Sequence, residues 1–532
     1  MAKQISYQSL TDIGLNGLNT QSNPASLDLS YLVKAENVVI RESGRIAFRK
    51  GLKQKVAPSG TSIASIHEHD DQGTNKIVVS YGTSIYVVDF TSPASAFPSS
   101  GADVKHTVSG SSGNWQFVNF NDRLHCFHAG IEPQRYDGSL SSGSRWTAHA
   151  TKPSTVSSNQ FKPTCGMGYY GRIWAGGVAE SPDVVYYSNL LDGDDWTGGD
   201  AGLIDLSKVW GIDDVIAIAP FYGKLVIFGK NNIVIYDRPE TVGSLALNEV
   251  IRGVGLVSRD TVQAIGDDLV FLSNTGLRSL GRTTEKDKLP LTDLSVNIKD
   301  TLIRNIGQSS NVKSVYVENE GIYIMSFVDK NITYVFDFKH FTPNNAPRIT
   351  TWTFDNDREP TSLSYTETYG LLVGQKDGGL AGYEGYYDTD LAGASTYSYS
   401  SYTSSIATTW INLGESIAAS FLKRLFLVLE GGSGATLGLK WYKDYSPSPS
   451  ETTSITLNPT TTGSTALWGA STSLYGKSGV TYKPIYGLHE YKTPLTGSAK
   501  NLKLEIDIES NGFDASLQDL TLLHKQLSLI HI

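Results

Sequence analysis

Cysteine is nearly absent from this sequence of 532 residues. Only Cys126 and Cys165 serve the whole length, so neither a disulfide framework nor a zinc site with four cysteine ligands can be built. We therefore expect a fold that is stable without covalent or metal cross-links, and we expect no cofactor.

Positive charge is also in deficit. Lys and Arg number 44 against 53 Asp and Glu, which gives a net charge of -9. Proteins that hold nucleic acid through a broad basic face usually carry an excess of Lys and Arg, so this class is disfavoured. Any contact with DNA is expected to be local or non-adhesive.

Long hydrophobic runs are missing as well. No apolar stretch approaches the roughly 18–20 residues of a membrane-spanning helix. The first residues, MAKQISYQSLTDIG, include Lys3 but lack the apolar segment of a secretory signal. The sequence therefore predicts a soluble protein without a membrane span, made in the cytoplasm and released, if at all, by lysis.

What the sequence does contain is typical of an all-β protein. Thr, Val, Ile, Tyr and Ser are abundant, and Gly, Asn and Asp interrupt the apolar runs at about 8–12 residue intervals. The chain is too long for one ordinary core, because single domains rarely exceed ~250–300 residues. A long all-β chain must also protect its sheet edges, and radial repetition is a main way to do so.

Seven segments repeat one pattern of three short strands, the first two joined by a tight polar turn and the third ending in an aromatic residue. Successive segments begin 46 to 53 residues apart. Units of this length with three or four strands are the blades of a β-propeller. We therefore predict a propeller over residues 61–390 with about seven blades, although six or eight remain compatible with the spacing. The segments begin at Ile63, Trp115, Cys165, Asp214, Thr261, Ser314 and Pro360.

Turns and strand ends make the predicted repeat more specific. Residues that tolerate a left-handed backbone are expected to reverse the chain between first and second strands. These turns are Asn121-Asp122, Tyr170-Gly171, Tyr222-Gly223, Asp267-Asp268 and Glu320-Gly321. The third strands are expected to end at equivalent blade positions, marked by Asp89, Tyr136, Tyr236 and Asp337.

The two ends of the chain follow neither pattern. Residues 391–532 contain longer strands, and Lys503 to Glu509 alternate charged and apolar side chains, so a C-terminal β-sandwich-like domain is predicted. Residues 446–478 are rich in Ser, Thr and Gly and are expected to form a long loop or hairpin. Residues 1–60 are predicted to form an N-terminal arm, with eight basic and four acidic residues among the first 55.

The predicted arm carries the residues through which this chain resembles a known family. The order GLNT at residues 17–20, Asn23-Pro24, and A-x-N-V-V-x-R-x-x-G-x-x-x-x-R-x-G at residues 35–51 is similar to the N-terminal signature of tail nozzle proteins of short-tailed, podovirus-type bacteriophages, also called tail tubular protein B. A second stretch, RIWAGGVAESPDVVYYSNLLDGDDW at residues 172–196, resembles another element of that family. The resemblance covers the arm and the propeller, and the C-terminal part only in architecture.

The resemblance implies a structural protein of the virion that is not an enzyme. It implies a propeller subunit in a hexameric ring below the head-to-tail connector, in the phage tail. Double-stranded DNA would pass through the lumen of this ring during ejection without specific binding. The implied partners are further copies of the chain, the connector or adaptor protein, and tail fibre or spike proteins. The ring is expected in the virion even if the isolated chain is monomeric.

Two local patterns suggest binding chemistry, and in both a structural interpretation is favoured. The stretch from Ser188 to Trp196 resembles a degenerate Asp-box of sialidase propellers, a turn whose Trp packs between blades. The pattern His67-x-His69 places two imidazoles on one strand face, as a metal site requires. No further ligand follows in a fixed pattern, so a solvated turn is expected there.

Two other patterns suggest catalysis or phosphate binding. In His125-Cys126-Phe127-His128 the cysteine lies in an apolar second strand, where a buried thiol acts as a small hydrophobic group. Gly476-Lys477-Ser478 matches the end of a phosphate-binding loop, but the glycine required five positions earlier is Ser471. Neither pattern predicts an enzyme.

One alternative function belongs to another class. A carbohydrate-binding or carbohydrate-cleaving propeller that serves as a phage adhesin would share the fold. Cleavage would need two carboxylates that converge on one cleft, which the sequence alone does not reveal. A nozzle subunit forms a closed ring, whereas an adhesin binds glycan.

The basic residues of the arm allow two interpretations. They can contact DNA phosphates, or they can pair with acidic surface on a neighbouring subunit or connector. A conduit must release its cargo, so the second is favoured, and reversal of these charges to Glu is expected to leave the propeller folded but weaken attachment. If it does not, the arm packs through its apolar residues Val38, Val39, Ile40 and Phe48. The predicted partner contacts are Arg41, Arg45, Arg49, Lys50 and Lys53.

Overall fold

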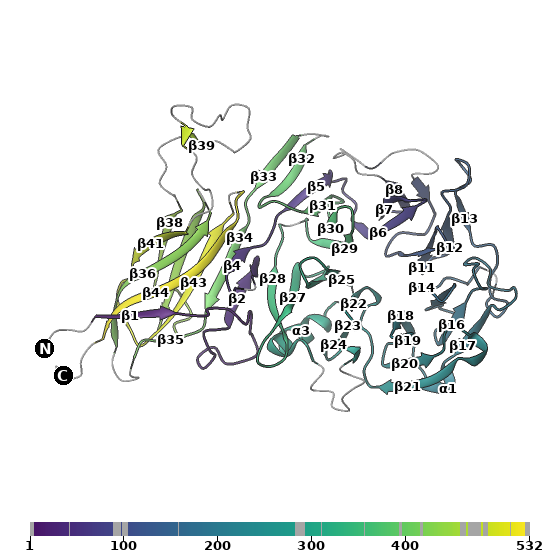
Figure 1. Ribbon diagram of the computed structural model, residues 1–532, viewed down its shortest axis with the longest axis horizontal. Helices are drawn as coiled ribbons and strands as arrows, with labels where there is room; N and C mark the ends of the chain where they lie inside the picture. The colour runs from purple at the N-terminus through teal and green to yellow at the C-terminus, as the bar shows by residue number, and fades with distance from the viewer. Residues whose placement is uncertain are drawn as a thin grey trace.

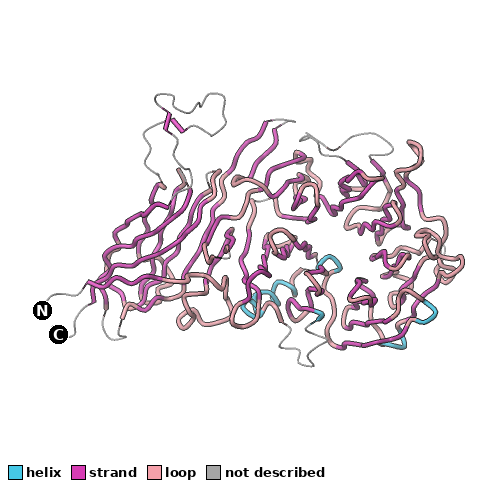
Figure 2. Tube along the Cα trace, in the orientation of Figure 1, coloured by secondary structure: helices cyan, strands magenta, loops and turns pink. Residues whose placement is uncertain are grey.

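The computed structural model describes residues 5–41, 43–88, 97, 105–157, 159–281, 293–309, 311–355, 357–392, 396–414, 419–432, 434–457, 464–465, 480–481, 488–510 and 512–526. Strands make up most of the regular structure (Figure 2), so the chain is all-β as predicted. Within this part of the chain, no helix has both the length and the apolar character needed to cross a membrane. The short helices are α1 (Ser207–Trp210), α3 (Lys299–Ile306), η1 (Val242–Ser244), η2 (Arg259–Thr261) and η4 (Val296–Ile298).

A ring of short sheets forms a β-propeller, at the right of Figure 1. In its first four blades, four antiparallel strands pair in chain order, so neighbours in the sheet are also neighbours in sequence. These blades are β6 (Ile63–Asp71), β7 (Thr74–Tyr81), β8 (Ser84–Val88) and β9 (Lys105–Thr107); β10 (Gln116–Phe120), β11 (Arg123–His128), β12 (Ile131–Tyr136) and β13 (Trp146–Ala148); β14 (Cys165–Tyr169), β15 (Arg172–Gly176), β16 (Val184–Tyr187) and β17 (Gly202–Asp205); and β18 (Val215–Phe221), β19 (Lys224–Gly229), β20 (Asn232–Asp237) and β21 (Ala246–Arg252).

Over the described residues, the ring has six four-stranded blades, which corrects the prediction of about seven. The segment that begins at Thr261 forms a three-stranded sheet in the described residues, and η4 and α3 follow it. Its strands are β22 (Gln263–Ile265), β23 (Asp268–Ser273) and β24 (Gly276–Ser279). The next segment is complete, with β25 (Val312–Val317), β26 (Ile322–Phe327), β27 (Ile332–Phe341) and β28 (Pro347–Trp352).

A strand from the beginning of the chain completes the last blade. Three strands pair in chain order, and β5 (Leu52–Val56) then adds antiparallel to β31, with Val56 opposite Leu380. Leu380 and Ile63 of the first blade belong to one apolar cluster, so this strand joins the end of the ring to its start. The three strands are β29 (Pro360–Thr366), β30 (Gly370–Gln375) and β31 (Leu380–Tyr383).

Equivalent blade positions carry related residues, as the repeat predicts. Tyr136, Tyr236 and Phe336 lie in third strands, each opposite the second residue of the preceding strand. The predicted marker Asp337 directly follows Phe336, so it lies one position beyond the site equivalent to Tyr136 and Tyr236, and that part of the prediction is wrong. Asp89 lies outside the described residues.

The aspartates after these aromatic residues bind cations of their own blades. Asp137 pairs with Arg123 at 2.9 Å, and Asp237 pairs with Lys224 at 3.3 Å. In both cases the cation is the first residue of the second strand, so the pair closes the hairpin beside the turn.

The predicted turns lie where the chain reverses, with one displacement. Asn121-Asp122, Tyr170-Gly171 and Tyr222-Gly223 all have positive φ at both positions, and Gly321 has φ 61° in the turn before β26. Between β22 and β23 the turn is Gly266-Asp267 and not Asp267-Asp268. Gly266 takes φ 58° there, a conformation that glycine adopts at little cost.

Two large sheets lie beside the propeller, at the left of Figure 1. The seven-stranded sheet contains β1 (Ile5–Leu10), β3 (Val38–Ile40), β4 (Ile46–Phe48), β36 (Ser420–Gly431), β41 (Leu488–Pro494), β42 (Ser498–Ala499) and β44 (Ala515–Gln526). The ten-stranded sheet continues from β28 of the propeller through β2 (Leu32–Glu36), β34 (Thr403–Thr408), β43 (Asn501–Glu509), β37 (Thr436–Lys443) and β38 (Glu451–Thr456), with β35 (Ile411–Asn412) paired to β43.

One apolar core lies between these two sheets. Leu425 and Leu427 of β36 belong to the same buried cluster as Leu439 of β37 and Leu504 of β43. Burial alternates along β43, as the charged and apolar alternation predicts. The C-terminal strands share this core with strands from the N-terminal part of the chain, because both sheets take strands from each part.

The described part of residues 1–60 is built into the fold and does not extend as an arm. β1, β3 and β4 join the seven-stranded sheet, β2 joins the ten-stranded sheet, and β5 closes the propeller. The physical reason is that this segment carries its own alternating apolar side chains, such as Val38, Ile40 and Phe48, all of which are buried.

The remaining strands extend these sheets or stand apart. β32 (Asp388–Ala392) and β33 (Thr396–Ser400) form a hairpin that continues the sheet of the last blade beyond β5. Within the predicted loop at residues 446–478, β38 is formed, and most of the rest lies outside the described residues. β39 (Ser464–Thr465) and β40 (Val480–Thr481) form a separate two-stranded sheet.

Candidate functional site: a buried arginine joint

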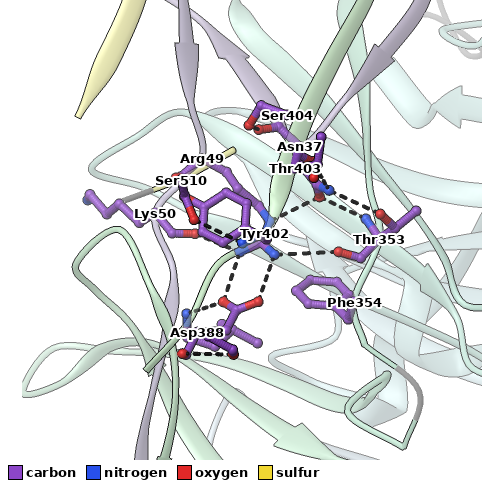
Figure 3. A network of polar contacts seen from close by, with 12 residues as sticks. Asn37, Arg49, Lys50, Thr353, Phe354, Asp388, Tyr402, Thr403, Ser404 and Ser510 are labelled. Atoms are coloured by element: carbon purple, nitrogen blue, oxygen red, sulfur yellow. Dashed lines mark hydrogen bonds and ion pairs between the residues drawn. The ribbon is translucent and has the colours of Figure 1, made fainter. Parts of the chain in front are cut away.

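Arg49 lies at the junction between the propeller and the two large sheets (Figure 3). The chain leaves the seven-stranded sheet at the end of β4, passes Arg49, and enters β5 of the propeller. The Arg49 side chain has no exposed surface, so its charge must be satisfied by the protein itself. We call this residue and its partners the arginine joint.

All hydrogen-bonding directions of the Arg49 guanidinium are used. Nη1 and Nη2 donate to the two carboxylate oxygens of Asp388 at 3.3 and 3.2 Å. Nη1 also donates to the Lys50 carbonyl at 2.8 Å, Nη2 to the Thr353 carbonyl at 3.4 Å, and Nε to Asn37 Oδ1 at 3.0 Å. Five bonds match the five N–H groups of the side chain, and the two-pronged contact with a carboxylate is the strongest geometry open to it.

Aromatic rings cover the guanidinium. Its central carbon lies 4.0 Å from the ring centre of Tyr402 and 4.9 Å from that of Phe354. The Tyr402 hydroxyl donates to the Arg49 carbonyl, and burial raises the pKa of Tyr402 far above its usual value. The joint therefore excludes water, which strengthens each of its electrostatic contacts.

Asn37 orients the arginine from the side of the large sheets. Its backbone has φ 55°, which asparagine tolerates better than most residues. Its side-chain oxygen accepts from Arg49 and from the Thr353 amide at 2.9 Å, and its nitrogen donates to Thr353 Oγ1 at 3.0 Å and to the Thr403 carbonyl at 2.9 Å. One side chain thus connects β3, the end of β28 and β34.

Glycines of the same segment allow close backbone contacts. A Cβ on Gly51 would stand 2.0 Å from the Tyr387 carbonyl oxygen, and one on Gly17, where φ is 74°, would stand 2.7 Å from the Ile349 carbonyl oxygen. Neither position can accept a side chain without movement of the backbone.

The other predicted partner contacts meet carboxylates of their own chain. Arg41 pairs with Asp514, Arg45 with Glu430 at 3.0 Å, and Lys50 with Glu320. Each of the three cations is about two-fifths exposed, with side-chain values of 40%, 43% and 43%. Lys53 lies on β5 opposite Gly382.

These positions correct part of the sequence-based interpretation. Arg49 is buried, so the prediction that it contacts a partner is wrong, and reversal of its charge would damage the fold instead of leaving it intact. Val38, Ile40 and Phe48 pack inside the fold of their own chain. The sequence did not reveal these pairings because the carboxylates lie hundreds of residues away along the chain.

A cavity of about 550 Å³ opens beside the joint. Arg348 pairs with Asp337 at 2.6 Å in its wall, and the Lys339 amino group donates to the Asn319 carbonyl at 3.4 Å. The lining carries more cations than carboxylates, so an acidic side chain would be tolerated in it. The charged lining residues are Arg41, Lys50, Glu320, Asp337, Lys339 and Arg348.

The histidines of the first blade do not form a solvated turn, which corrects the prediction. His67 and His69 lie within β6 and pack against the second blade, where His67 stacks on Phe117 and His69 Nδ1 lies 2.8 Å from Asn119 Oδ1. Burial lowers the pKa of His67 to about 4. No group of three or more potential metal ligands occurs in the described part of the chain.

The pattern His125-Cys126-Phe127-His128 contains a buried, unreactive cysteine. Its His125 belongs to a chain of hydrogen bonds with His149 and Trp196, which we call the histidine relay. Cys126 is buried, and burial raises the pKa of its thiol well above the usual value. Trp196 Nε1 donates to His149 Nδ1 at 3.0 Å, so His149 carries its proton on Nε2 and donates it to His125 Nδ1, also at 3.0 Å. His125 must then carry its proton on Nε2, which has no partner among the described residues.

This relay gives the Asp-box-like stretch its structural role. Trp196 packs with Phe161 and lies in one buried cluster with Phe127 of the second blade and Ile173 of the third. The prediction of a tryptophan between blades is therefore confirmed. His149 was missed because it has no motif around it, and Gly476-Lys477-Ser478 lies outside the described residues.

The sequence also shows no sign of a second polar cluster, which lies just before the first strands of two blades. Arg259 donates to the carbonyl oxygens of Thr164 and Trp115, which precede the first strands of two blades. Asp260 accepts from Asn114 and from Lys313 at 2.8 Å. Two consecutive residues thus tie together units that are far apart in sequence.

Comparisons with known proteins concern the fold alone. No protein-family model and no curated protein sequence matches this chain. BamB from Moraxella catarrhalis is similar at 10% identity and a TM-score of 0.36, over 66% of this chain and 96% of that one. The Pan2 WD40 domain of Neurospora crassa is similar at 7% identity and a TM-score of 0.38, over 63% of this chain and 95% of that one. PorZ of Porphyromonas gingivalis, a surface component of the type-IX secretion system, is similar at 11% identity and a TM-score of 0.38, over 68% of this chain and 43% of that one.

Proposed function

We propose that this chain is a structural, non-enzymatic virion protein of a short-tailed bacteriophage. In this proposal six copies form the ring-shaped tail nozzle below the head-to-tail connector. The ring encloses part of the channel that retains the genome and through which DNA is ejected. Its partners are the connector or adaptor and the tail fibres or spikes.

The observation that carries the proposal is that the residues of the nozzle-like signature converge on the arginine joint. Asn37, Arg49 and Gly51 are all signature positions, and each has a contact that few other residues could make. Gly17 of the same signature makes the close approach to β28. The residues that carry the resemblance are therefore the ones that fix the propeller to the two large sheets.

The charge arrangement also suits a conduit. A channel that retains each phosphate would slow the passage of DNA, because every basic contact adds affinity. In this chain Arg41, Arg45 and Lys50 are neutralised by carboxylates of the same chain, and the net charge is -9. The basic signature thus contributes to cohesion without offering an adhesive surface to DNA.

The test is an asymmetric reconstruction of phage particles that contain this chain. We expect six copies in a closed ring directly below the connector, with the DNA path enclosed by the ring. Three or twelve copies would refute the stoichiometry, and particles with a complete tail that lack the chain would refute the function. A glycan array with the purified chain tests the adhesin alternative, which requires saturable binding of an oligosaccharide.

A further inference from the structure

Two exposed surfaces on different parts of the molecule complement each other. The first, which we call the tyrosine face, lies on the third and fourth blades and consists of Tyr170, Leu190, Leu191 and Tyr222. The second, which we call the basic sheet face, lies on the outer side of the seven-stranded sheet and consists of the exposed Tyr7, Phe421, Lys423 and Arg424 together with the half-buried Lys525. In Figure 1, β14 and β18 lie in the right half of the molecule, and β1, β36 and β44 lie at its left end.

The tyrosine face is one continuous patch. A Cβ on Gly223, next to Tyr222, would stand 3.6 Å from the Tyr170 hydroxyl, and a Cβ on Gly171 would stand 3.1 Å from Leu190 and 3.4 Å from Leu191. Tyr222 is 67% exposed and Leu191 is 66% exposed. Large apolar side chains that gather in water at one place mark an interaction surface.

Backbone strain sets this face apart from an accidental exposure. Tyr170, Leu191 and Tyr222 have φ of 47°, 58° and 46°, a left-handed conformation that is unfavourable for bulky residues. The equivalent turn of the second blade is Asn121-Asp122, two residue types that tolerate this conformation. A fold that could use asparagine but holds strained, exposed aromatic residues points to a function for their side chains.

Carboxylates surround the tyrosine face. Asp192 follows Leu191, and Asp122 follows Asn121, whose amide donates to the Leu191 carbonyl at 2.8 Å. Glu240 lies near the rings of Tyr169 and Tyr170, which are tilted by 54° and have centres 4.4 Å apart.

The balance of charge at this face is negative. Asp122, Asp192 and Glu240 form no ion pair with any residue in the described ranges, and the exposed Arg238 on the loop of Glu240 offsets only one of them. The face is therefore suited to a partner that presents apolar and cationic groups together.

The basic sheet face presents that combination. Tyr7, Leu523 and Arg424 lie opposite one another across β1, β44 and β36, and Lys525 lies opposite Phe421 in the next row. Residues opposite one another in antiparallel strands point to the same side of the sheet. Lys423 and Arg424 form no ion pair with another residue that the structure describes, and an arginine can stack on a tyrosine ring while it pairs with a carboxylate.

We propose that the tyrosine face of one copy binds the basic sheet face of a second copy of this chain. The choice of a second copy rests on the proposed ring, whereas the two surfaces are argued from their exposure, strain and charge. Because two different faces meet, the contact repeats head to tail and closes into a ring when the rotation between copies allows it. The two faces lie far apart along the long axis of the molecule, so one copy leaves both available.

Cross-linking between two single-cysteine variants tests this contact. Both native cysteines are buried, so introduced surface cysteines react selectively. Tyr222→Cys and Phe421→Cys are prepared separately, mixed, and treated with a short bismaleimide. We expect a covalent heterodimer that forms at least about tenfold faster than with Tyr222→Cys and Tyr445→Cys, because Tyr445 is exposed outside the basic sheet face.

Charge reversal then tests the pairing itself. Glu240→Lys in the first variant and Arg424→Glu in the second should each slow cross-linking, and the two together should restore it. Glu367→Lys, a reversed carboxylate on an exposed turn of another blade, is the matched control and should leave the rate unchanged. Circular dichroism of each variant confirms that the fold is retained.

The outcomes separate this contact from the proposed function. Cross-linking no faster than the control pair, or insensitive to both reversals, overturns the proposed contact, while particle imaging decides the nozzle function independently. Saturable binding of an oligosaccharide that is lost in Tyr222→Ala also overturns it and assigns the tyrosine face to a glycan.

Discussion

The propeller and the region around the arginine joint are held together in opposite ways. In five four-stranded blades of the described residues every strand pairs with its neighbour in sequence, so short hairpins decide the structure. The seven-stranded sheet instead combines strands from the first fifty residues with strands that begin after residue 419, and Arg49 meets Asp388 across 339 positions. A locally built ring can lose one contact and keep its pattern, whereas the joint depends on a few distant partners.

The largest expected effect is the loss of the buried guanidinium. Arg49→Met leaves the Asp388 carboxylate buried without its cation and removes the partner of Asn37 Oδ1. We expect a loss of about 3–5 kcal/mol in the free energy of unfolding, measured by urea denaturation followed by circular dichroism. The matched control is Arg45→Met, whose half-exposed pair with Glu430 should be worth only ~0–1 kcal/mol.

A compensating variant makes this comparison sharper. Arg49→Met combined with Asp388→Leu removes both charges and should recover much of the lost stability, because no ion is then left unpaired in the core. Equal losses in Arg49→Met and Arg45→Met would show that the joint is no more sensitive than the surface.

An intermediate effect is expected from acid on the histidine relay of the propeller. Burial, together with Arg135 and Arg123, lowers the pKa of His125 from 6.5 to about 3. Between these values the unfolded chain binds a proton that the folded chain does not, so unfolding is favoured as pH falls. The stability that depends on neutral His125 is therefore complete above pH 6.5 and is lost progressively toward pH 3.

The variant His125→Phe isolates this contribution. It removes the acceptor of the His149 N–H, so it should be less stable than the parent protein at neutral pH by roughly 1–3 kcal/mol. It no longer titrates, so the difference in unfolding free energy should shrink as pH falls below 6.5. A difference that is constant with pH would mean that His125 does not couple protonation to folding.

The smallest expected effect has the opposite sign. Tyr222→Asn relieves a bulky residue at φ 46° and should stabilise the purified monomer by about 0.5–1 kcal/mol, measured by thermal or urea unfolding. Tyr7→Asn is the control, since this exposed tyrosine lies in strand β1 and its loss should not stabilise. If both changes destabilise, the turn of the fourth blade is not strained in solution.

Much of the propeller could be predicted because each blade is formed by residues that are close together in the sequence. Positive-φ turns such as Asn121-Asp122 and the regular spacing of apolar strands are visible in the sequence itself. The count of complete blades was less accessible, because outer strands such as β9 and β13 have only three residues and leave a weak pattern. The sequence thus showed where each unit begins more clearly than whether it has a fourth strand.

Only some residues of the arginine joint could be predicted from the sequence. The signature singled out Asn37, Arg49 and Gly51, but nothing near them indicates Asp388 or Thr353, since these partners come from other strands. One signal was present: Arg49 directly follows the apolar residues Ile46 to Phe48, and a cation at the end of a buried strand requires a partner. Arg259 and His149 stood in no motif at all, so only the structure could bring them to attention.

The pairing of β5 with β31 also has a consequence for how the protein is made. The ribosome produces residues 52–56 long before residues 380–383, so the first closing strand must wait, unpaired, until the last blade has emerged. The same holds for β1, whose partner β44 is the last strand among the described residues. A prematurely terminated chain can therefore close neither the ring nor the seven-stranded sheet, and its open strand edges would mark it for chaperones or proteases. Only a copy translated through β44 hides these edges, so the fold itself screens copies truncated before that strand from assembly.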